Sequence, residues 1–216
     1  MVTQLSEENS VANHFLAELR DVHVQKDPMR FRRNLERMGE VMAYEISKTL
    51  DYAEREVLSP LGVANMSLPA DQPVLATILR AGLPLHQGLL NYFDRADNAF
   101  VSAYRKHRKG EDGFDGEVEY LISPSIDDRI LVISDPMLAS GRSMVLVHKA
   151  LMRMGRPKAV HVVAVIASTE GMEYVQKHLP ANVHYWIGAI DEEMTAEAYI
   201  VPGLGDAGDL AYGNKV

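Results

Sequence analysis

The first quarter of the chain has apolar residues at helical spacing. Between Asn9 and about Glu56 they recur every three or four positions, and the pair Asp27-Pro28 interrupts them. This pattern predicts two helices that are separated at Pro28. We therefore expect an N-terminal helical segment over residues 1–58.

From about residue 74 the pattern alternates between short apolar runs and amphipathic segments. The amphipathic segments predict helices over residues 83–93, 143–154 and 170–179. Near-continuous apolar strands separated by helices are typical of a mainly parallel sheet covered on both faces, so the predicted class is α/β. The five runs that we interpret as buried strands are VLATIL (Val74–Leu79), AFVSAY (Ala99–Tyr104), ILVIS (Ile130–Ser134), VHVVAVIA (Val160–Ala167) and VHYWIGAI (Val183–Ile190).

The segment from Lys106 to Asp128 breaks this alternation. It is charged and rich in Gly, and it contains the alternating stretch VEYLI. Such a segment between two strands favours a hairpin, so we expect a flexible hairpin arm over residues 106–128.

The bulk composition indicates one globular domain. The chain has 216 residues, of which 47% are hydrophobic and 24% charged, and its formal net charge is −8. An acidic protein has no general attraction for a polyphosphate backbone, so nucleic acid is not an expected partner. The sequence contains no Cys, which excludes disulfides, zinc–cysteine sites and thiol nucleophiles and fits a reducing cytoplasm. No apolar run is long enough for a membrane helix, and we expect no membrane partner.

The stretch SDPMLASGRS, residues 134–143, is the first candidate site. It follows an apolar strand and precedes a helix, where ligands of open α/β sheets bind and where helix amides attract anions. Donors from Ser140 to Ser143 could surround a terminal phosphate, and Asp135 could accept hydrogen bonds from sugar hydroxyls. The alternative is an ordinary turn in which a Ser caps the helix.

Arginines that follow two of the predicted strands are the second candidate. Arg80 is followed by the small residues Ala81 and Gly82, which leave room for a diphosphate against the guanidinium group. Tyr104-Arg105 repeats this placement at the end of the next strand. Alone, an arginine that follows a strand is more often a surface residue.

The third candidate is PGLGDAGD, residues 202–209. It matches G-x-G-x-x-G, but eight residues remain after Gly208, so it cannot open the long helix of a dinucleotide-binding unit. A backbone with so few side chains can instead read a flat base through its own N–H and C=O groups, and uracil presents the complementary edge. A loop without a ligand is the alternative. The preceding Asp191 to Glu193 are expected to form a solvated turn.

Together these segments resemble the uracil phosphoribosyltransferase family. The matching stretches are ILRAG (Ile78–Gly82), Tyr104-Arg105, DPMLASGRS against DPMLATGGS in the family, and YIVPGLGDAGD (Tyr199–Asp209), in the same order. RFRRNLERMGEVMAYE (Arg30–Glu45) extends the resemblance over nearly the whole chain. The C-terminal stretch is the most specific, because it separates uracil enzymes from other phosphoribosyltransferases.

The resemblance implies a type I phosphoribosyltransferase fold and a cytoplasmic enzyme of pyrimidine salvage. This enzyme would convert uracil and 5-phosphoribosyl 1-diphosphate (PRPP) to UMP and diphosphate, with Mg²⁺ carried by PRPP rather than held by protein ligands. A homodimer or larger homo-oligomer is implied, and GTP activates some members. Residues 199–216 would form the uracil-binding loop.

The resemblance also assigns the site residue by residue. Catalytic roles fall to Arg80, Arg105, Asp135 and Asp206. Uracil would be held by Ile200, Gly205, Asp206 and Ala207. PRPP would be held by Arg80, Arg105, Asp135, Pro136, Met137, Leu138, Ala139, Ser140, Gly141, Arg142, Ser143 and Asp206.

One departure from the family pattern concerns Arg142, which replaces a Gly. It is similar to the TGRT loop of bifunctional pyrimidine regulators, and we expect it to be tolerated unless the position needs a positive φ. Two other functions stay open: a PRPP- or nucleotide-binding regulator with weak or no catalysis, and a transferase acting on a purine base.

Overall fold

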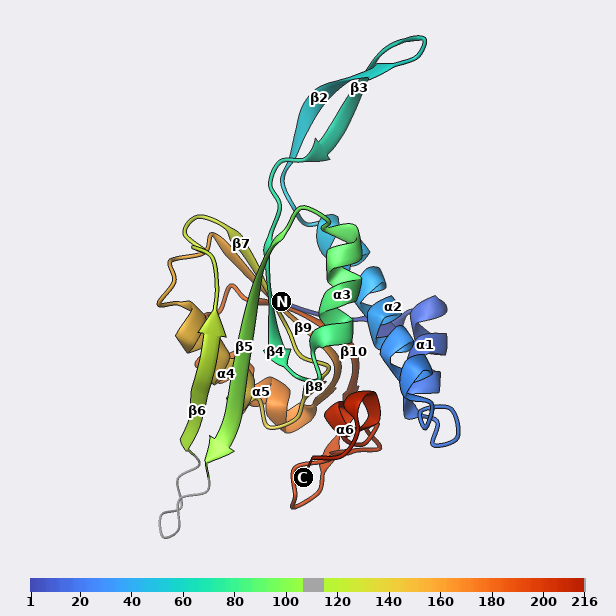
Figure 1. The fold of residues 1–216 in the computed structure, drawn as a ribbon, viewed down its shortest axis with the longest axis vertical. Coiled ribbons are helices and arrows are strands. Elements are labelled where there is room, and N and C mark those ends of the chain that lie inside the picture. The colour runs from blue at the N-terminus through green and yellow to red at the C-terminus, as the bar shows by residue number, and fades with distance from the viewer. Residues whose placement is uncertain (107–114, 216) are drawn as a thin grey trace.

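A single twisted sheet organises the molecule (Figure 1). The computed structural model describes the backbone of residues 1–106 and 115–215, and side chains outside residues 103–117. All neighbours in the sheet run parallel except the antiparallel pair β5 and β6, so the mainly parallel α/β class is confirmed. The strands, in spatial order, are β1 (Val2–Gln4), β10 (His184–Asp191), β9 (Ala159–Ser168), β7 (Ile130–Ser134), β4 (Val74–Leu79), β5 (Asp97–Lys106) and β6 (Asp115–Ile122), with the short β8 (Met137–Leu138) paired to β9.

Three helices cover one face of the sheet: α1 (Val11–Arg20), α2 (Pro28–Ser47) and α3 (Leu83–Tyr92) (Figure 1). The predicted break between the first two is confirmed, because Asp27 caps α2 by accepting hydrogen bonds from the amides of Met29 and Arg30. A Cβ on Gly39 of α2 would overlap the carbonyl of Leu85 in α3. The two helix backbones therefore touch, which fixes the position of α3.

The opposite face is covered by α4 (Arg142–Leu151) and α5 (Thr169–His178) (Figure 1). Ser168 caps α5 by accepting from the amide of Gly171. A separate apolar cluster fills the space between these helices and the sheet. The sheet is thus buried on both faces, which explains why its strands are almost continuously apolar.

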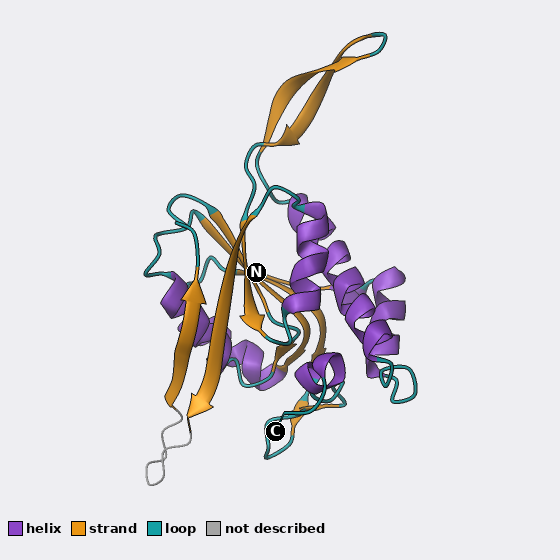
Figure 2. Cartoon of the chain, in the orientation of Figure 1, coloured by secondary structure: helices purple, strands orange, loops and turns teal. Residues whose placement is uncertain are grey.

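The expected N-terminal helical segment over residues 1–58 is too long. The last helix there ends at Ser47, and β2 (Tyr52–Ser59) pairs antiparallel with β3 (Gly62–Pro69) in a hairpin that projects away from the sheet (Figure 2). Nearly all residues of this hairpin are exposed on both of its faces. The alternation of buried and exposed positions that marks a strand is therefore missing.

The flexible hairpin arm predicted over residues 106–128 stays a prediction, although the structure describes the strands on either side of its middle part. β6 is antiparallel to β5 and forms an edge of the main sheet, with a register shift at Ser102 and Ala103. Residues 107–114 lie outside the described residues. Ile126, near the end of this segment, is completely buried, so its C-terminal part belongs to the core.

The C-terminal segment returns to the sheet on the side of α1 and α2. β11 (Glu193–Met194) pairs with β12 (Ile200–Val201), and the short helix α6 (Ala207–Tyr212) follows. The expected loop over residues 199–216 therefore includes a strand and a helix. α6 lies near the carboxyl ends of the central strands (Figure 1).

Candidate active site

The three candidate segments meet at the carboxyl end of the sheet. Ala81, which follows β4, packs into the same apolar cluster as Met137 and Ala139 of the segment Asp135–Ser143, hereafter the phosphate loop. That cluster also contains buried residues of the C-terminal segment, namely Ile200, Leu204, Ala207 and Ala211. This arrangement agrees with the rule that open α/β sheets bind ligands beyond the carboxyl ends of their strands.

The phosphate loop is fixed to β9 through its backbone. The carbonyl of Pro136 accepts from the amides of Val165 and Ile166, and the carbonyl of Ala139 accepts from the hydroxyl of Ser168 at 2.6 Å. β8, Met137–Leu138, adds two parallel pairs to β9. The loop therefore enters α4 from a rigid base.

Gly141 allows the sharp turn into α4. Its φ is +70°, and a Cβ there would lie 2.8 Å from the carbonyl oxygen of Gly171. No side chain among the described residues caps the N-terminus of α4. Its first amides, together with the partly exposed hydroxyls of Ser140 and Ser143, form the environment that binds phosphate groups in proteins.

Arg142 is the first residue of α4, and its φ is not positive. The position therefore has no backbone requirement for Gly. That an arginine is tolerated here stays a prediction, to which the backbone raises no objection.

Asp135 lies directly after β7 at the base of the phosphate loop. Burial raises the pKa of its carboxyl group to about 7, although a hydrogen bond from the Met137 amide lowers it in part. Ionisation of this carboxyl group is costly in the ligand-free protein. A ligand that supplies hydrogen-bond donors or a cation would therefore stabilise the carboxylate strongly.

Arg80 contacts the C-terminal segment. Its Nη2 lies 2.7 Å from Oδ1 of Asp209 and donates to the carbonyl of Gly213 at 2.9 Å. A Cβ on Gly208 would lie 3.7 Å from Nε of Arg80. The arginine predicted to bind diphosphate is thus held against the segment predicted to bind the base.

Arg105 lies on the backbone of β5, opposite Gly116 of β6. Its side chain is outside the described residues, so the predicted contact of Arg105 with the diphosphate stays a prediction.

The segment Pro202–Asp209, hereafter the glycine-rich loop, exposes its backbone at Gly205. Gly203 and Gly205 have positive φ. Gly205 is exposed, whereas only 6% of Ile200 is exposed. A side chain at Gly203 would overlap the carbonyl of Ile200. The loop is therefore tightly folded, with bare main chain on its outer side.

Asp206 caps α6, because its Oδ1 accepts from the amide of Asp209 at 2.9 Å and its Oδ2 lies 3.1 Å from Nζ of Lys215. Burial alone raises the pKa of Asp206, but these donors outweigh it, and the pKa lies below its ordinary value. Asp206 is consequently a stable carboxylate and a weak base.

The glycine-rich loop is anchored by two residues that the sequence analysis missed. Arg20, at the end of α1, contacts both carboxylate oxygens of Asp191 at 2.7 Å and donates to the carbonyl of Gly203. Asp191 in turn accepts from the amide of Gly203 at 2.9 Å. Asp191 is only 7% exposed, so its assignment to a solvated turn is wrong, although Glu192 and Glu193 are exposed.

Among the described residues, no group of three His, Cys, Asp or Glu side chains is placed to hold a metal ion. No helix in the described part of the chain is both long enough and apolar enough to cross a membrane.

Comparison with known proteins identifies the family. Residues 6–214 match the family described as uracil phosphoribosyltransferase. A uracil phosphoribosyltransferase from Porphyromonas gingivalis (strain ATCC BAA-308 / W83) is 56% identical over 215 residues, which cover 100% of this chain and 99% of the relative. Another from Methanothermobacter thermautotrophicus is 40% identical over 189 residues, or 87% and 85% of the two chains.

Solved structures agree on the fold. The AQ2163 protein from Aquifex aeolicus is 27% identical and superimposes with a TM-score of 0.87 over 100% of both chains. A hypoxanthine phosphoribosyltransferase from Staphylococcus aureus has a TM-score of 0.51 at 12% identity over 76% of each chain, a likeness that extends to the fold alone. The predicted phosphoribosyltransferase fold is confirmed, and the chain belongs to the uracil phosphoribosyltransferase family.

Proposed function

We propose that this enzyme transfers the phosphoribosyl group of PRPP to N1 of uracil, giving UMP and diphosphate in pyrimidine salvage. The bond between the anomeric carbon and the diphosphate oxygen breaks, the bond from that carbon to N1 forms, and the N1 proton is released. The observation that carries the proposal is that the phosphate loop, Arg80 and the glycine-rich loop share one end of the sheet.

In this proposal the 5-phosphate of PRPP binds the amides and hydroxyls from Ser140 to Ser143. Asp135 accepts hydrogen bonds from the ribose hydroxyls, as its place at the end of β7 supports. Arg80 and Arg105 bind the diphosphate. Arg80 already contacts Asp209 and Gly213. PRPP would therefore either share Arg80 with these two residues or displace them from it. In both cases the binding of PRPP would affect the glycine-rich loop.

Uracil would bind against the main chain at Gly205, Asp206 and Ala207, of which Gly205 is exposed, and would contact Ile200. Its O4, N3–H and O2 alternate as acceptor, donor and acceptor, which amides and a carbonyl can match. Cytosine has an amino donor in place of O4, so two donors would oppose each other and binding would be strongly reduced.

Mg²⁺ belongs to this proposal as a companion of PRPP. Mg²⁺ prefers oxygen ligands and usually keeps several waters, so the phosphates of PRPP would hold it without a protein ligand. When bound, the ion would stabilise the negative charge of the leaving diphosphate. The rise of the Asp135 pKa by burial fits a carboxylate that is stabilised when ribose hydroxyls donate hydrogen bonds to it.

Catalysis would be mainly electrostatic. Negative charge grows on the diphosphate and positive charge on the ribose ring as the bond loosens, and preformed arginine donors stabilise the former. The lowered pKa of Asp206 makes it a weak acceptor for the N1 proton, so its role would be to hold the loop and contact the ligands.

We also propose that the enzyme is a homo-oligomer joined through the β2–β3 hairpin. Leu58 is 84% exposed and Leu61 is 100% exposed, and β2 and β3 pair only with each other among the described strands. Isolated apolar side chains are ordinary on surfaces, but several exposed apolar side chains on one hairpin that projects from the core are typical of a protein interface. The exposed apolar side chains of this hairpin are Tyr52, Val57, Leu58, Leu61, Val63, Met66 and Leu68.

Two further parts of the proposal rest on the family resemblance. One is a cytoplasmic location, with which the absence of Cys is compatible. The other is activation by GTP, which initial rates measured with and without GTP at subsaturating PRPP would test.

The activity is tested by incubating the protein with PRPP, Mg²⁺ and one radiolabelled base at a time. We expect label from uracil to enter UMP, with little or no transfer to cytosine, orotate or hypoxanthine. Transfer to hypoxanthine alone would identify a purine enzyme. Tight binding of PRPP without transfer to any base would favour a regulator on the same fold.

A further inference from the structure

Gln25 lies in the turn between α1 and α2 and reaches the glycine-rich loop with its side chain. Its Nε2 donates to the carbonyl of Leu19 at 2.8 Å and to the carbonyl of Leu204 at 3.2 Å. A side-chain amide nitrogen has two N–H donors, so both are used. Gln25 lies outside every stretch that carries the family resemblance, and no role in the site has been assigned to it.

The side chain of Gln25 is itself held in one orientation. Its backbone amide donates to the carbonyl of Asp21 at 2.9 Å. The carbonyl of Leu19 is in the last turn of α1, where carbonyls lack partners within the helix. If the side-chain amide were turned over, its oxygen would face two carbonyl oxygens, so the turned orientation is unfavourable.

Hydrogen bonds hold the start of the glycine-rich loop and stop at Leu204. Arg20 donates to the carbonyl of Gly203, and Gln25 donates to the carbonyl of Leu204. Gly205 follows outside any helix or strand, and within the described chain no hydrogen bond involves its amide or its carbonyl. The free main chain of the loop therefore begins directly after the carbonyl that Gln25 holds.

The peptide between Leu204 and Gly205 has little else to fix its orientation. A peptide group is planar and trans, so its C=O and N–H point in opposite directions. Gly205 has a φ of +90°, and glycine adopts positive and negative φ about equally well. A Cβ on Gly205 would meet no atom closer than 3.7 Å, so close contacts do not hold this residue. The hydrogen bond from Gln25 therefore selects the orientation of the peptide.

We propose that Gln25 is a positioning residue of the base site. By holding the carbonyl of Leu204, it fixes the peptide that leads into Gly205, so that the free main chain of Gly205 faces the base in the orientation that pairs with uracil. This inference rests on the proposed function, because it takes uracil to bind at Gly205. Gln25 acts through the loop and takes no part in the transfer itself.

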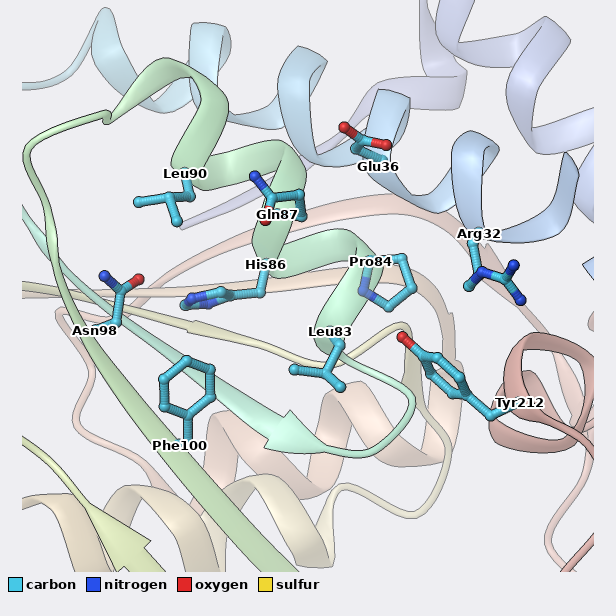
Figure 3. Close-up of a pocket in the computed structure, with 10 residues that line it drawn as sticks. All are labelled: Arg32, Glu36, Leu83, Pro84, His86, Gln87, Leu90, Asn98, Phe100 and Tyr212. Carbon is cyan, nitrogen blue, oxygen red and sulfur yellow. The ribbon is translucent and has the colours of Figure 1, made fainter. Parts of the chain in front are cut away.

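The far end of the C-terminal segment is held separately. Arg32 of α2 donates to the carbonyl of Ala211 at 2.7 Å, and its guanidinium carbon lies 5.9 Å from the ring centre of Tyr212. Figure 3 shows Arg32 and Tyr212 among the residues that line a cavity beside α3, none of which belongs to the glycine-rich loop. A change at Gln25 should therefore disturb the loop and leave the end of α6, which Arg80 contacts, in place.

Steady-state kinetics of Gln25→Met test the proposal. Met has a similar length but no donor, so the KM for uracil should rise about tenfold, while the KM for PRPP should stay within about twofold. Lys26→Met changes the exposed neighbouring position of the same turn and should alter neither KM. If Gln25→Met does not fold, Gln25→Glu has the same length without the donor and gives the same test. An unchanged KM for uracil, or an equal rise of both KM values, overturns the proposal.

Gln25→Lys separates hydrogen bonding from packing. A Lys side chain ends in three N–H donors, so it should recover part of the affinity for uracil that Gln25→Met loses. If Gln25 acted only by filling space, Met would be the better replacement because it is closer in size and uncharged. A lower KM for uracil in Gln25→Met than in Gln25→Lys therefore overturns the positioning role.

Hydrogen exchange of the ligand-free protein gives a readout that does not depend on activity. The amides of Gly203 and Asp209 are hydrogen-bonded, so their exchange reports opening of the glycine-rich loop. Exchange in this loop should be about threefold or more faster in Gln25→Met than in the parent, and unchanged in Lys26→Met. Equal exchange in Gln25→Met and the parent overturns the inference, whatever the parent does with uracil. Faster exchange in Gln25→Met alone, with a parent that transfers nothing to uracil, would overturn the proposed function and support the hold of Gln25 on the loop.

Discussion

Arg20 and Asp191 form a bidentate ion pair across 171 positions of sequence, with both N–O distances at 2.7 Å. The pair encloses the backbone of Gly203, because Asp191 accepts from its amide and Arg20 donates to its carbonyl. The guanidinium and carboxylate thus hold the entry of the glycine-rich loop in one conformation. Neither side chain needs to touch a substrate for this to affect catalysis.

Arg20→Ala should raise the KM for uracil by roughly tenfold or more, because small displacements of a binding loop are costly for the reaction. The KM for PRPP should change less. Arg20 is about a quarter exposed, so we expect a loss of about 2 kcal/mol in unfolding free energy, below the range for fully buried pairs. Steady-state kinetics and thermal unfolding check both values.

Arg30→Ala is the matched control for this prediction. Arg30 also makes a bidentate pair, with Glu18, but it lies away from the glycine-rich loop. It should leave the KM for uracil unchanged. Arg20→Lys should restore the charge but only part of the affinity, since an ammonium cannot form the two-pronged contact. Equal effects of the Arg20 and Arg30 variants on both KM values would contradict a positioning role.

Asp135→Asn should stabilise the empty protein at high pH while reducing activity. The folded pKa of Asp135 is raised to about 7 from 3.8, so its ionisation costs stability as the pH rises from about 4 to 7, and the full cost is present above 7. Removing the charge should therefore gain up to about 4 kcal/mol at pH 8 and almost nothing near pH 4.

Thermal unfolding at pH 4.5, 6 and 8 measures this trend, and turnover with PRPP should fall at every pH. Asp94→Asn, which removes an exposed carboxylate, should give no such trend. A stabilisation that is independent of pH would show that burial of the Asp135 charge is not its source.

The sequence was informative where local pattern and burial agree. Val74–Leu79 and Ile130–Ser134 were predicted to the residue, because strands buried on both faces are continuously apolar. The β2–β3 hairpin was missed because exposure on both faces removes the alternating pattern. Gly141 and the glycine-rich loop could be found from their residue types, whereas the pairing of Arg20 with Asp191 depends on the folded sheet and leaves no local signal.

Gly141→Ala should disrupt the phosphate loop. A Cβ at φ +70° costs about 1 to 2 kcal/mol in conformation alone, and here it would also lie 2.8 Å from a carbonyl oxygen and from Cγ1 of Val175. We expect lower stability and a KM for PRPP raised about tenfold or more by displacement of the α4 amides. Gly62→Ala, at a positive φ in open space on the hairpin, should affect neither KM. An unchanged KM for PRPP in Gly141→Ala would remove the phosphate loop from the proposed site.

Changing Leu58 and Leu61 to Ser together should lower the oligomeric state. Both are at the end of the projecting hairpin and lack cover from the described part of the chain. Light scattering after size-exclusion chromatography should give a smaller mass for the double variant. Val22→Ser, which alters a 60% exposed apolar residue between α1 and α2, is the control and should keep the parent mass. A parent protein that is already monomeric would contradict the proposed interface.

The fluorescence of Trp186, the single Trp of the chain, should report the titration of His161. The indole N–H donates to Nδ1 of His161 at 3.0 Å, so that nitrogen can gain a proton only if the bond is lost. Burial and the neighbouring His184 lower the pKa of His161 to about 4 from 6.5, so the folded state resists a proton that the unfolded state accepts. Stability should consequently fall as the pH decreases from about 6.5 to 4, by about 3 kcal/mol in total from this group.

We expect a fluorescence transition with a midpoint near pH 4, and His161→Gln, which retains an acceptor, should abolish it and flatten the loss of stability. A midpoint near 6.5 would mean that His161 is open to water and that the bond to Trp186 does not persist in solution.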